Sequence, residues 1–250
     1  MPSDLFSRPR VVMLNIKAAS VDAAAMAAQT YGDDVVIGVV ARDFDTPKDA
    51  AAFVDQLHER GVHVSAGLGD GAADQWERAL DVALLSHPVH LNQVFPAAAL
   101  SQAKLNDAGA PTVVNALVQP SGTPGVVRVA TGPRSQFDEG GDLSVEAALD
   151  MMSEMDVLSL KFHPLQGTSR LDELAEVAAA TAERDMMLEP TGGITPENLE
   201  EVLAVCLGAG VNRVMPHLYS SVADETGELS GELLAEAMSA RDRAMNRAWT

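Results

Sequence analysis

Short apolar runs alternate with longer amphipathic segments along most of the chain. The runs are rich in β-branched residues and have few polar positions, which is typical of parallel strands covered on both faces. The eight predicted strands span residues 11–16, 35–40, 62–66, 89–94, 112–117, 157–161, 186–189 and 213–216.

The segments between these runs have helical spacing. Thr46-Pro47 and Thr195-Pro196 are helix-start signals, and Gly61 and Gly208 are stop signals. The eight predicted helices span residues 21–31, 47–60, 71–86, 97–108, 144–154, 170–184, 196–208 and 231–248. Eight strand–helix units within 250 residues predict an α/β fold, a (β/α)8 barrel forming one domain over residues 1–250. An open doubly wound sheet is the alternative, but no Gly-x-Gly-x-x-Gly follows the first strand.

Residues 119–141 interrupt this alternation after the fifth predicted strand. The segment contains a β-like run at 126–130 and an acidic, glycine-rich stretch. It follows the carboxyl end of a strand, where barrels place their active sites. We expect either a lid over the site or a hairpin without a catalytic role.

The charge balance excludes some classes of partner. The formal net charge of −19 argues against nucleic acid, which requires clustered Lys and Arg. It fits either simple solubility or adaptation to high salt, where self-repulsion is screened. An anionic substrate would need the few cations focused in one cleft.

Three features bear on location. The apolar runs are shorter than the 18 or so residues of a membrane helix, and residues 1–10 do not resemble a secretory signal. The lone Cys206 excludes an internal disulfide. We therefore expect a cytoplasmic protein without a membrane partner.

Polar residues cluster at the ends of the predicted strands. In a barrel the carboxyl ends of all strands face the active site, so these side chains are the candidates for binding and catalysis. They are Asn15, Lys17, Arg42, Asp43, Asp70, Asn92, Gln93, Asn115, Lys161, His163, Glu189 and His217.

Lys161 is the candidate nucleophile because it ends an apolar run, 157–162. A desolvated lysine loses its proton more easily, and the neutral amine attacks carbonyl groups. A buried salt bridge to Glu189 is the structural alternative. Glu189 is also the candidate acid/base, with Asp43, Asp70 and a bound water as competitors.

A phosphate site is predicted at the ends of the last two strands. Thr191-Gly192-Gly193 and Ser220-Ser221 lie where barrels commonly bind phosphate, and glycine lets backbone amides approach an anion. Further cations available for a carboxylate or phosphate are Arg42, Arg128 and Arg134.

Two other functions remain open from the residues alone. His163, His217 and Glu189 could hold a divalent metal in a metal-dependent aldolase or sugar-phosphate isomerase. A non-catalytic barrel that binds a sugar acid would tolerate loss of Lys161.

Several stretches resemble the 2-keto-3-deoxy-6-phosphogluconate (KDPG) aldolases, in particular those of glucosaminate and related sugar-acid breakdown. Lys161-Phe162-His163-Pro164 and Pro190-Thr191-Gly192-Gly193-Ile194 resemble the signatures of these aldolases. Further similar stretches span residues 91–95, 115–118, 122–125, 188–194 and 216–221.

This resemblance implies a class I aldolase with a barrel fold and no metal or other cofactor. It would cleave KDPG, a small phosphorylated keto acid, to pyruvate and glyceraldehyde 3-phosphate through a Schiff base at Lys161. Similar substrates such as 4-hydroxy-2-oxoglutarate are alternatives, and related aldolases commonly form homo-oligomers. The Glu-Ile/Val-Thr-x-Arg stretch of the better-known KDPG aldolases is absent, and residues 39–43 offer Arg42 and Asp43 in its place, so Glu189 becomes the expected acid/base.

Overall fold

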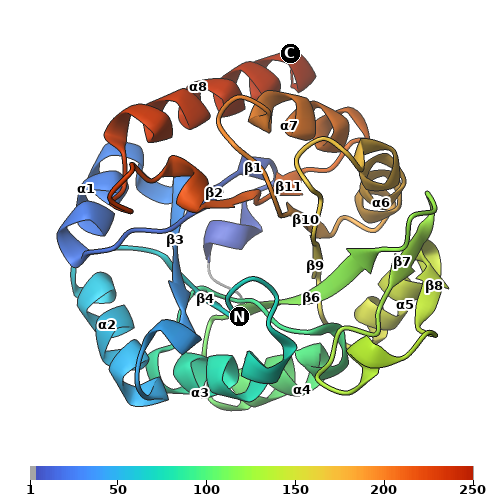
Figure 1. Cartoon of the computed structure of the whole chain (residues 1–250), viewed down its shortest axis with the longest axis horizontal. Coiled ribbons are helices and arrows are strands. Elements are labelled where there is room, and N and C mark those ends of the chain that lie inside the picture. The colour runs from blue at the N-terminus through green and yellow to red at the C-terminus, as the bar shows by residue number, and fades with distance from the viewer. Residues whose placement is uncertain (1–3, 250) are drawn as a thin grey trace.

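A closed ring of eight parallel strands, surrounded by helices, forms the core of the protein (Figure 1). The computed structural model describes residues 4–249. Positions 1–3 and 250 of the expected domain lie outside the described residues, and so do the first three residues of the segment 1–10 that does not resemble a secretory signal. Strands β1 (Val11–Val12) and β2 (Leu14–Ile16) are halves of the first barrel strand, and β11 (Arg213–Val214) and β12 (His217–Tyr219) are halves of the last. Pairing of β1 with β11 and of β2 with β12 closes the ring.

The predicted barrel is confirmed, with the expected alternation of strands and helices. The remaining parallel strands are β3 (Val35–Val40), β4 (Val64–Gly67), β5 (His90–Leu91), β6 (Val113–Pro120), β9 (Ser159–Phe162) and β10 (Met187–Pro190). The helices are α1 (Val21–Tyr31), α2 (Pro47–Glu59), α3 (Trp76–Ser86), α4 (Phe95–Asp107), α5 (Val145–Glu154), α6 (Leu171–Glu183), α7 (Leu199–Gly208) and α8 (Gly231–Ala248).

Two predicted helix starts are wrong for local reasons. Helix α3 begins at Trp76 rather than at residue 71, because a separate 3-10 turn, Ala73–Gln75, precedes it. Helix α7 begins at Leu199 rather than at residue 196. The Asn198 side chain accepts a hydrogen bond from the Thr195 amide at 2.9 Å and holds the intervening residues in a turn.

The insertion after the fifth barrel strand forms a hairpin against α5. Strands β7 (Val126–Arg128) and β8 (Asp142–Ser144) pair antiparallel with each other, and β7 also pairs with the end of β6. The segment is anchored by Thr131, whose hydroxyl donates to the Leu117 carbonyl and accepts from the Phe95 amide. This observation supports the hairpin expectation.

Side chains alternate between the inside of the barrel and the helix layer. The outward residues pack with the helices in the main core. The inward residues at the amino-terminal end of the barrel form an apolar floor of Phe6, Val11, Met13, Val36, Met187 and Met215. Phe6 enters this floor from the 3-10 turn Asp4–Ser7, which leads into the first strand.

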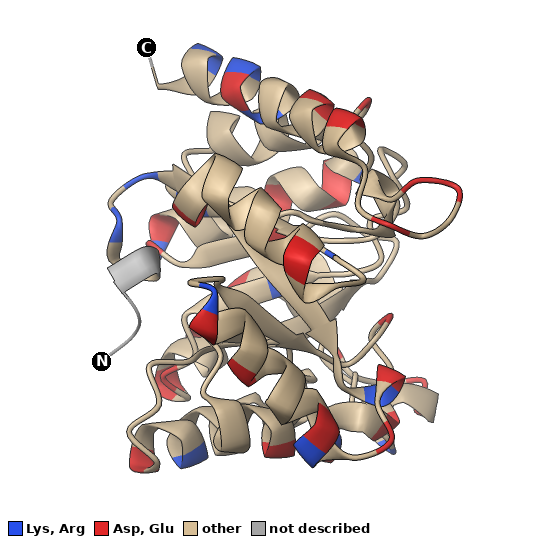
Figure 2. Ribbon diagram, turned by 90° about the vertical axis from the view of Figure 1, so that its left-hand side faces the viewer, with Lys and Arg blue, Asp and Glu red and all other residues tan. Residues whose placement is uncertain are grey.

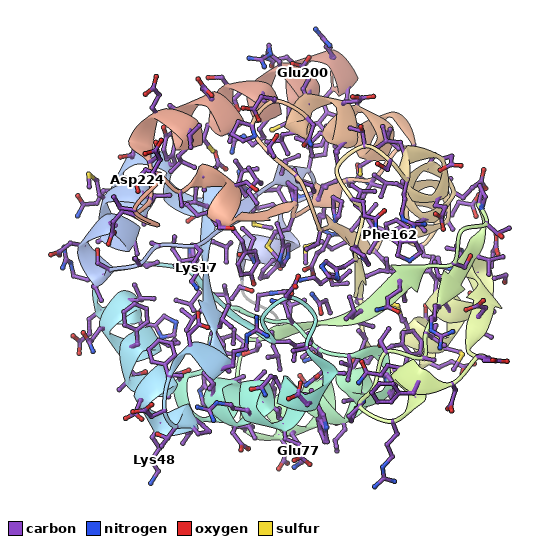
Figure 3. All side chains as sticks on the ribbon, in the orientation of Figure 1. Lys17, Lys48, Glu77, Phe162, Glu200 and Asp224 are labelled. Carbon is purple, nitrogen blue, oxygen red and sulfur yellow. The ribbon has the colours of Figure 1, made fainter. Side chains whose placement is uncertain are left out.

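Charged groups lie mainly on the outer helices and connecting loops (Figure 2). Figure 3 shows the contrast at single residues: Lys48, Glu77 and Glu200 lie at the periphery, whereas Lys17 lies within the ring of helices. Of the helices within residues 4–249, none combines the length and the apolar character that crossing a bilayer requires.

Candidate active site

Lys161 extends into the barrel from β9. Alternation along this strand turns Ser159 and Lys161 inward and Leu160 and Phe162 outward, so the lysine leaves the apolar run that encloses it. Its side chain is buried, with 7% of the residue's surface exposed. The nearest polar partners are both neutral: Nζ donates to Asn92 Oδ1 at 2.8 Å and lies 3.2 Å from His217 Nδ1.

Burial makes this lysine unusually acidic. It lowers the pKa of Lys161 to about 8, although the charges of Glu189 and Asp70 act in the opposite direction. A pKa of about 8 leaves roughly a tenth of the amine uncharged at neutral pH, compared with less than roughly a thousandth for an ordinary lysine. Lys161 is therefore suited to attack a carbonyl group.

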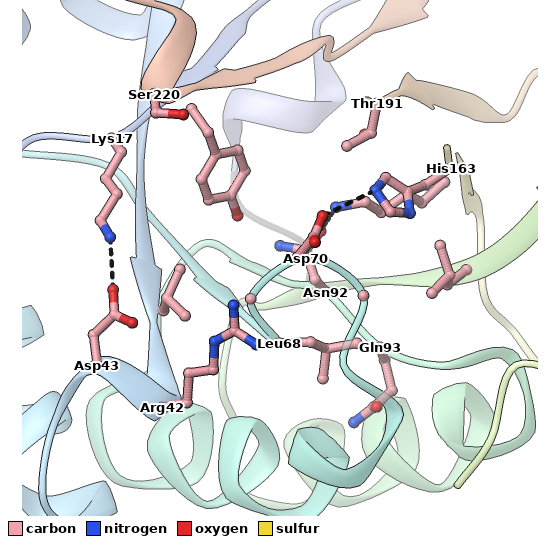
Figure 4. A pocket seen from close by; sticks show the side chains of 16 residues that line it. Lys17, Arg42, Asp43, Leu68, Asp70, Asn92, Gln93, His163, Thr191 and Ser220 are labelled. Atoms are coloured by element: carbon pink, nitrogen blue, oxygen red, sulfur yellow. Dashed lines mark hydrogen bonds and ion pairs between the residues drawn. The ribbon is translucent and has the colours of Figure 1, made fainter. Parts of the chain in front are cut away.

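A cavity of about 250 Å3 opens at the carboxyl ends of the strands, with Lys161 in its wall (Figure 4). Its lining consists of Lys17, Val40, Arg42, Asp43, Leu68, Gly69, Asp70, Gly71, Asn92, Gln93, Leu117, Lys161, His163, Thr191, Tyr219 and Ser220. The lining has three cationic side chains and two acidic ones, an excess of positive groups in a strongly acidic protein, which favours an anionic ligand.

Two pairs, each of a basic and an acidic residue, line opposite parts of the cavity (Figure 4). Lys17 Nζ lies 2.6 Å from Asp43 Oδ2, and His163 Nε2 lies 3.6 Å from Asp70 Oδ1. Burial and the charge of Lys161 lower the pKa of His163 to about 4. Arg42 lines the cavity beside the loop after β4, and its guanidinium is a candidate group for binding an anion.

Glu189 lies beneath the cavity rather than in its wall. The carboxylate is fully buried and accepts from four side chains: His90 Nε2 at 2.9 Å, His217 Nε2 at 2.8 Å, Asn115 Nδ2 at 2.7 Å and Ser159 Oγ. Burial alone would raise the pKa of Glu189, but the two histidines outweigh it and hold the pKa well below its usual range. Glu189 is therefore a stable buried carboxylate.

The depth of Glu189 follows from the groups that bind it, although Glu189 itself pairs in register with Lys161. The groups that bind it precede the cavity residues by two positions: Ser159 precedes Lys161, and His90 precedes Asn92. Inward residues two positions apart occupy successive layers of a barrel. The polar layer around Glu189 therefore lies between the apolar floor and the cavity.

His217 connects the two layers. Its Nε2 faces Glu189 and its Nδ1 faces Lys161 Nζ. Burial and the charge of Lys161 lower the pKa of His217 to about 3, so the ring is neutral. Tyr219 stacks on this ring with the two ring centroids 5.5 Å apart.

The predicted site residues divide into three groups. Lys161, Arg42, Asn92, Thr191 and Ser220 line the cavity. Asn115, His217 and Glu189 form the layer beneath, and Asn115 Nδ2 also donates to Asn92 Oδ1 at 3.0 Å. Residues outside the lining are Gly192, Gly193, Ser221 and Asn15; Asn15 is fully buried, and its amide atoms have no hydrogen-bond partner among the described residues.

Four residues of this site were not predicted to have a role at the nucleophile. Tyr219 and the buried Ser65, His90 and Ser159 all belong to the inner face of the barrel. For Tyr219, His90 and Ser159 the signal is present in the sequence, because each lies two positions from another inward polar residue, namely His217, Asn92 and Lys161; Ser65 has no such neighbour. The alternation is hard to recognise because the outward positions of these strands, and many of the inward ones, are apolar.

The metal-ligand set of the alternative function is not assembled. His217 Nε2 is directed at Glu189, whereas His163 Nε2 faces Asp70 at the cavity wall. Within residues 4–249, no three His, Cys, Asp or Glu side chains are grouped so that they could hold a metal ion.

The hairpin expected as a possible lid contributes nothing to the cavity wall. In the part of the chain that the structure describes, no residue from 119 to 144 belongs to the lining. Arg128 instead lies 3.7 Å from Asp142 within the hairpin itself.

Comparison with known proteins places these features in a family. The chain is 37% identical over 236 residues to a 2-dehydro-3-deoxy-phosphogluconate aldolase of Salmonella typhimurium, covering 93% of this chain and 95% of that protein. Among solved structures it resembles one described as native KDPGal, with a TM-score of 0.54 and 17% identity over 94% of this chain and 96% of that one. It also resembles the (S)-3-O-geranylgeranylglyceryl phosphate synthase of Thermoplasma acidophilum, with a TM-score of 0.56 and 12% identity, covering 96% of this chain and 98% of that one. These two likenesses support the barrel fold. The family model described as KDGP aldolase matches residues 8–226, and the chain therefore belongs to the KDGP aldolase family.

Proposed function

We propose that this protein is a class I aldolase that cleaves 2-keto-3-deoxy-6-phosphogluconate to pyruvate and glyceraldehyde 3-phosphate. The observation that carries the proposal is Lys161, a buried amine of lowered pKa in the wall of a cation-lined cavity. Its Nζ contacts neutral groups, so no ion pair has to break before it attacks the substrate's C2 carbonyl. The name of the Salmonella typhimurium relative supports this substrate.

The ends of the substrate suit different parts of the cavity. Attack at C2 brings the neighbouring carboxylate close to Lys161, within the part of the site that Asn92 and Arg42 line. The phosphate lies toward Thr191 and Ser220, with Lys17 as the nearby cation (Figure 4). Backbone amides of Gly192, Gly193 and Ser221, which follow or adjoin the lining residues Thr191 and Ser220 in the chain, are the further donors that we propose for this phosphate.

The direct test is pyruvate release from KDPG, measured with wild type and with Lys161→Arg, which keeps the charge but cannot form the iminium. Wild type should turn over in the presence of a chelator, and Lys161→Arg should lose at least about 1,000-fold in kcat. Turnover by Lys161→Arg, or its loss on chelation in wild type, would reject the class I mechanism. A parallel assay with 4-hydroxy-2-oxoglutarate, which lacks the phosphate, should give a much lower kcat/KM.

Two coarser features complete the proposal. We place the enzyme in the cytoplasm, since the lone cysteine, Cys206, is buried and forms no disulfide. It forms a homo-oligomer through exposed apolar side chains on the outer helices, among them Met26, Leu85 and Leu100. Light scattering coupled to size exclusion tests this directly, and a monomer at micromolar concentration would contradict it.

A further inference from the structure

His217 lies between the amine of Lys161 and the carboxylate of Glu189. Its Nε2 is 2.8 Å from Glu189 Oε2, and its Nδ1 is 3.2 Å from Lys161 Nζ. A carboxylate can only accept a hydrogen bond, so Nε2 carries the ring proton and donates it. The neutral ring then presents the lone pair of Nδ1 to the lysine.

The orientation of Glu189 is fixed from the other side. His90, Asn115 and Ser159 donate to it, and His90 Nδ1 is itself 2.8 Å from Ser65 Oγ. All these groups are buried in the closed barrel. Glu189 therefore has little freedom to rotate away from His217, and the proton position on the ring is set.

The amine geometry fits this arrangement. A neutral Lys161 has two N–H groups, and these have two acceptors, Asn92 Oδ1 and His217 Nδ1. The remaining tetrahedral direction is the lone pair, and the residue lines the cavity. The two hydrogen bonds thus orient the amine for attack.

We propose that His217 is the proton-transfer group for Schiff-base formation at Lys161, and that Glu189 is its positioning residue. This rests on the class I function proposed above. As the Nζ–C2 bond forms, the carbonyl π electrons move to oxygen, which takes a proton from solvent. Nζ, now with four bonds, passes one proton to His217 Nδ1. The imidazolium returns that proton to the hydroxyl, which leaves as water while the nitrogen electron pair forms the C=N bond.

Other titratable groups are directed elsewhere. Asp70 and His163 face each other across 3.6 Å, and Asp43 is paired with Lys17. The charges that act on Nζ come from Glu189 on β10 and Asp70 on the loop after β4, with His217 on β12 and His163 after β9 as neutral neighbours. Of the histidines and acids in residues 4–249, His217 is the one within hydrogen-bond distance of Nζ.

Glu189→Gln separates this role from simple control of the lysine pKa. The charge of Glu189 raises the pKa of Lys161, so its removal leaves more free amine at pH 7. A role limited to that charge therefore predicts equal or faster reaction with pyruvate. We expect the opposite, because the glutamine amide can donate to Nε2 and favour the tautomer whose proton sits on Nδ1.

The measurement is the rate of the pyruvate adduct at Lys161, trapped by borohydride at short times across pH 6–10. Glu189→Gln and His217→Asn should each be slower by about 100-fold or more, the usual scale for a general acid/base, with the half-saturating pyruvate concentration changed little. In Glu189→Gln the pH inflection should also move below that of wild type. Should Glu189→Gln fail to fold, His217→Asn carries the test, since asparagine keeps a hydrogen-bonding atom near Nδ1 but cannot titrate.

The matched control is His63→Asn. His63 also pairs with a carboxylate, its Nε2 lying 3.0 Å from Asp33 Oδ1, but the pair is solvent-accessible and outside the cavity. Its adduct rate should equal that of wild type. Wild-type rates in His217→Asn, or in Glu189→Gln at pH 7, would overturn the proposal. Absence of any adduct in wild type would instead overturn the class I function on which it rests.

Discussion

Lys161 is costly to the fold because its ammonium form is buried. The pKa of this group falls from 10.5, the ordinary lysine value, to about 8 in the folded protein. The folded state therefore binds fewer protons than the unfolded chain between those two pH values. Below about pH 8 the buried charge lowers the free energy of unfolding by its full amount, about 3 kcal/mol at most. Above the pKa of Lys161 in the unfolded chain this destabilisation disappears.

Lys161→Met should therefore be inactive and more stable than wild type at pH 7. We expect a gain of about 1–3 kcal/mol in the free energy of unfolding, smaller at pH 10 where wild type no longer buries a charge. Urea unfolding at both pH values measures it. Lys104→Met, at an exposed position of α4, is the control and should show no such pH-dependent gain. If Lys161→Met is less stable than wild type at pH 7, burial of the Lys161 ammonium group does not destabilise the folded protein.

At the scale of elements, the loop after β4 holds Arg42 against the cavity. Gly69 in this loop has a φ of +74°, and a Cβ there would lie 2.6 Å from Arg42 Nε. Gly61, in the turn after α2, has a similar φ of +71° but no atom within 4 Å of the same position. The two glycines share the conformational requirement and differ in their neighbours.

Gly69→Ala should cost more stability than Gly61→Ala and should also weaken substrate binding. Both lose about 1 kcal/mol to the left-handed conformation, and Gly69→Ala must in addition displace the side chains of Val40 and Arg42. We expect KM for KDPG to rise several-fold in Gly69→Ala alone. Equal effects of the two substitutions on stability and on KM would contradict a contribution of Arg42 to substrate binding.

Element order was predictable, whereas the depth of the inward residues was not. Eight apolar runs are enough to recognise a barrel, and Lys161 stands out as a cation ending such a run. Glu189 ends the neighbouring run in the same way, and it was expected at the mouth as the acid/base. Its actual place depends on His90, Asn115 and Ser159, which come from three other strands and meet only in the closed ring. The sequence around any one of these strands does not show that the four side chains meet.

At the scale of the whole molecule, the net charge of −19 contrasts with a cavity that gathers Lys17, Arg42 and Lys161. Acidic residues on the outer helices repel one another, and salt screens them over a Debye length of about 10 Å at 0.1 M. The buried network around Glu189 is closed to solvent and is screened far less. Salt should therefore weaken the repulsion between surface charges and leave the electrostatic interactions around Lys161 nearly unchanged.

Raising sodium chloride from about 0.05 M to about 1 M should increase the thermal unfolding midpoint by several degrees, because surface repulsion is screened within about 3 Å at 1 M. If the acidic surface is an adaptation to high salt, turnover of KDPG should persist at about 1 M. Scanning calorimetry and a pyruvate-release assay across the same salt series measure both. Inactivation or precipitation at about 1 M would leave solubility as the reason for the acidic surface.

A class I mechanism requires a covalent bond between Lys161 and the substrate, and borohydride reduction in the presence of pyruvate, followed by peptide mass mapping, detects that bond. We predict one reduced pyruvate adduct, located on Lys161 and lost in Lys161→Met. An adduct on Lys17, the other lysine of the cavity, would show that Lys161 is not the nucleophile. No adduct on any lysine, in enzyme that still releases pyruvate from KDPG, would contradict the Schiff-base mechanism.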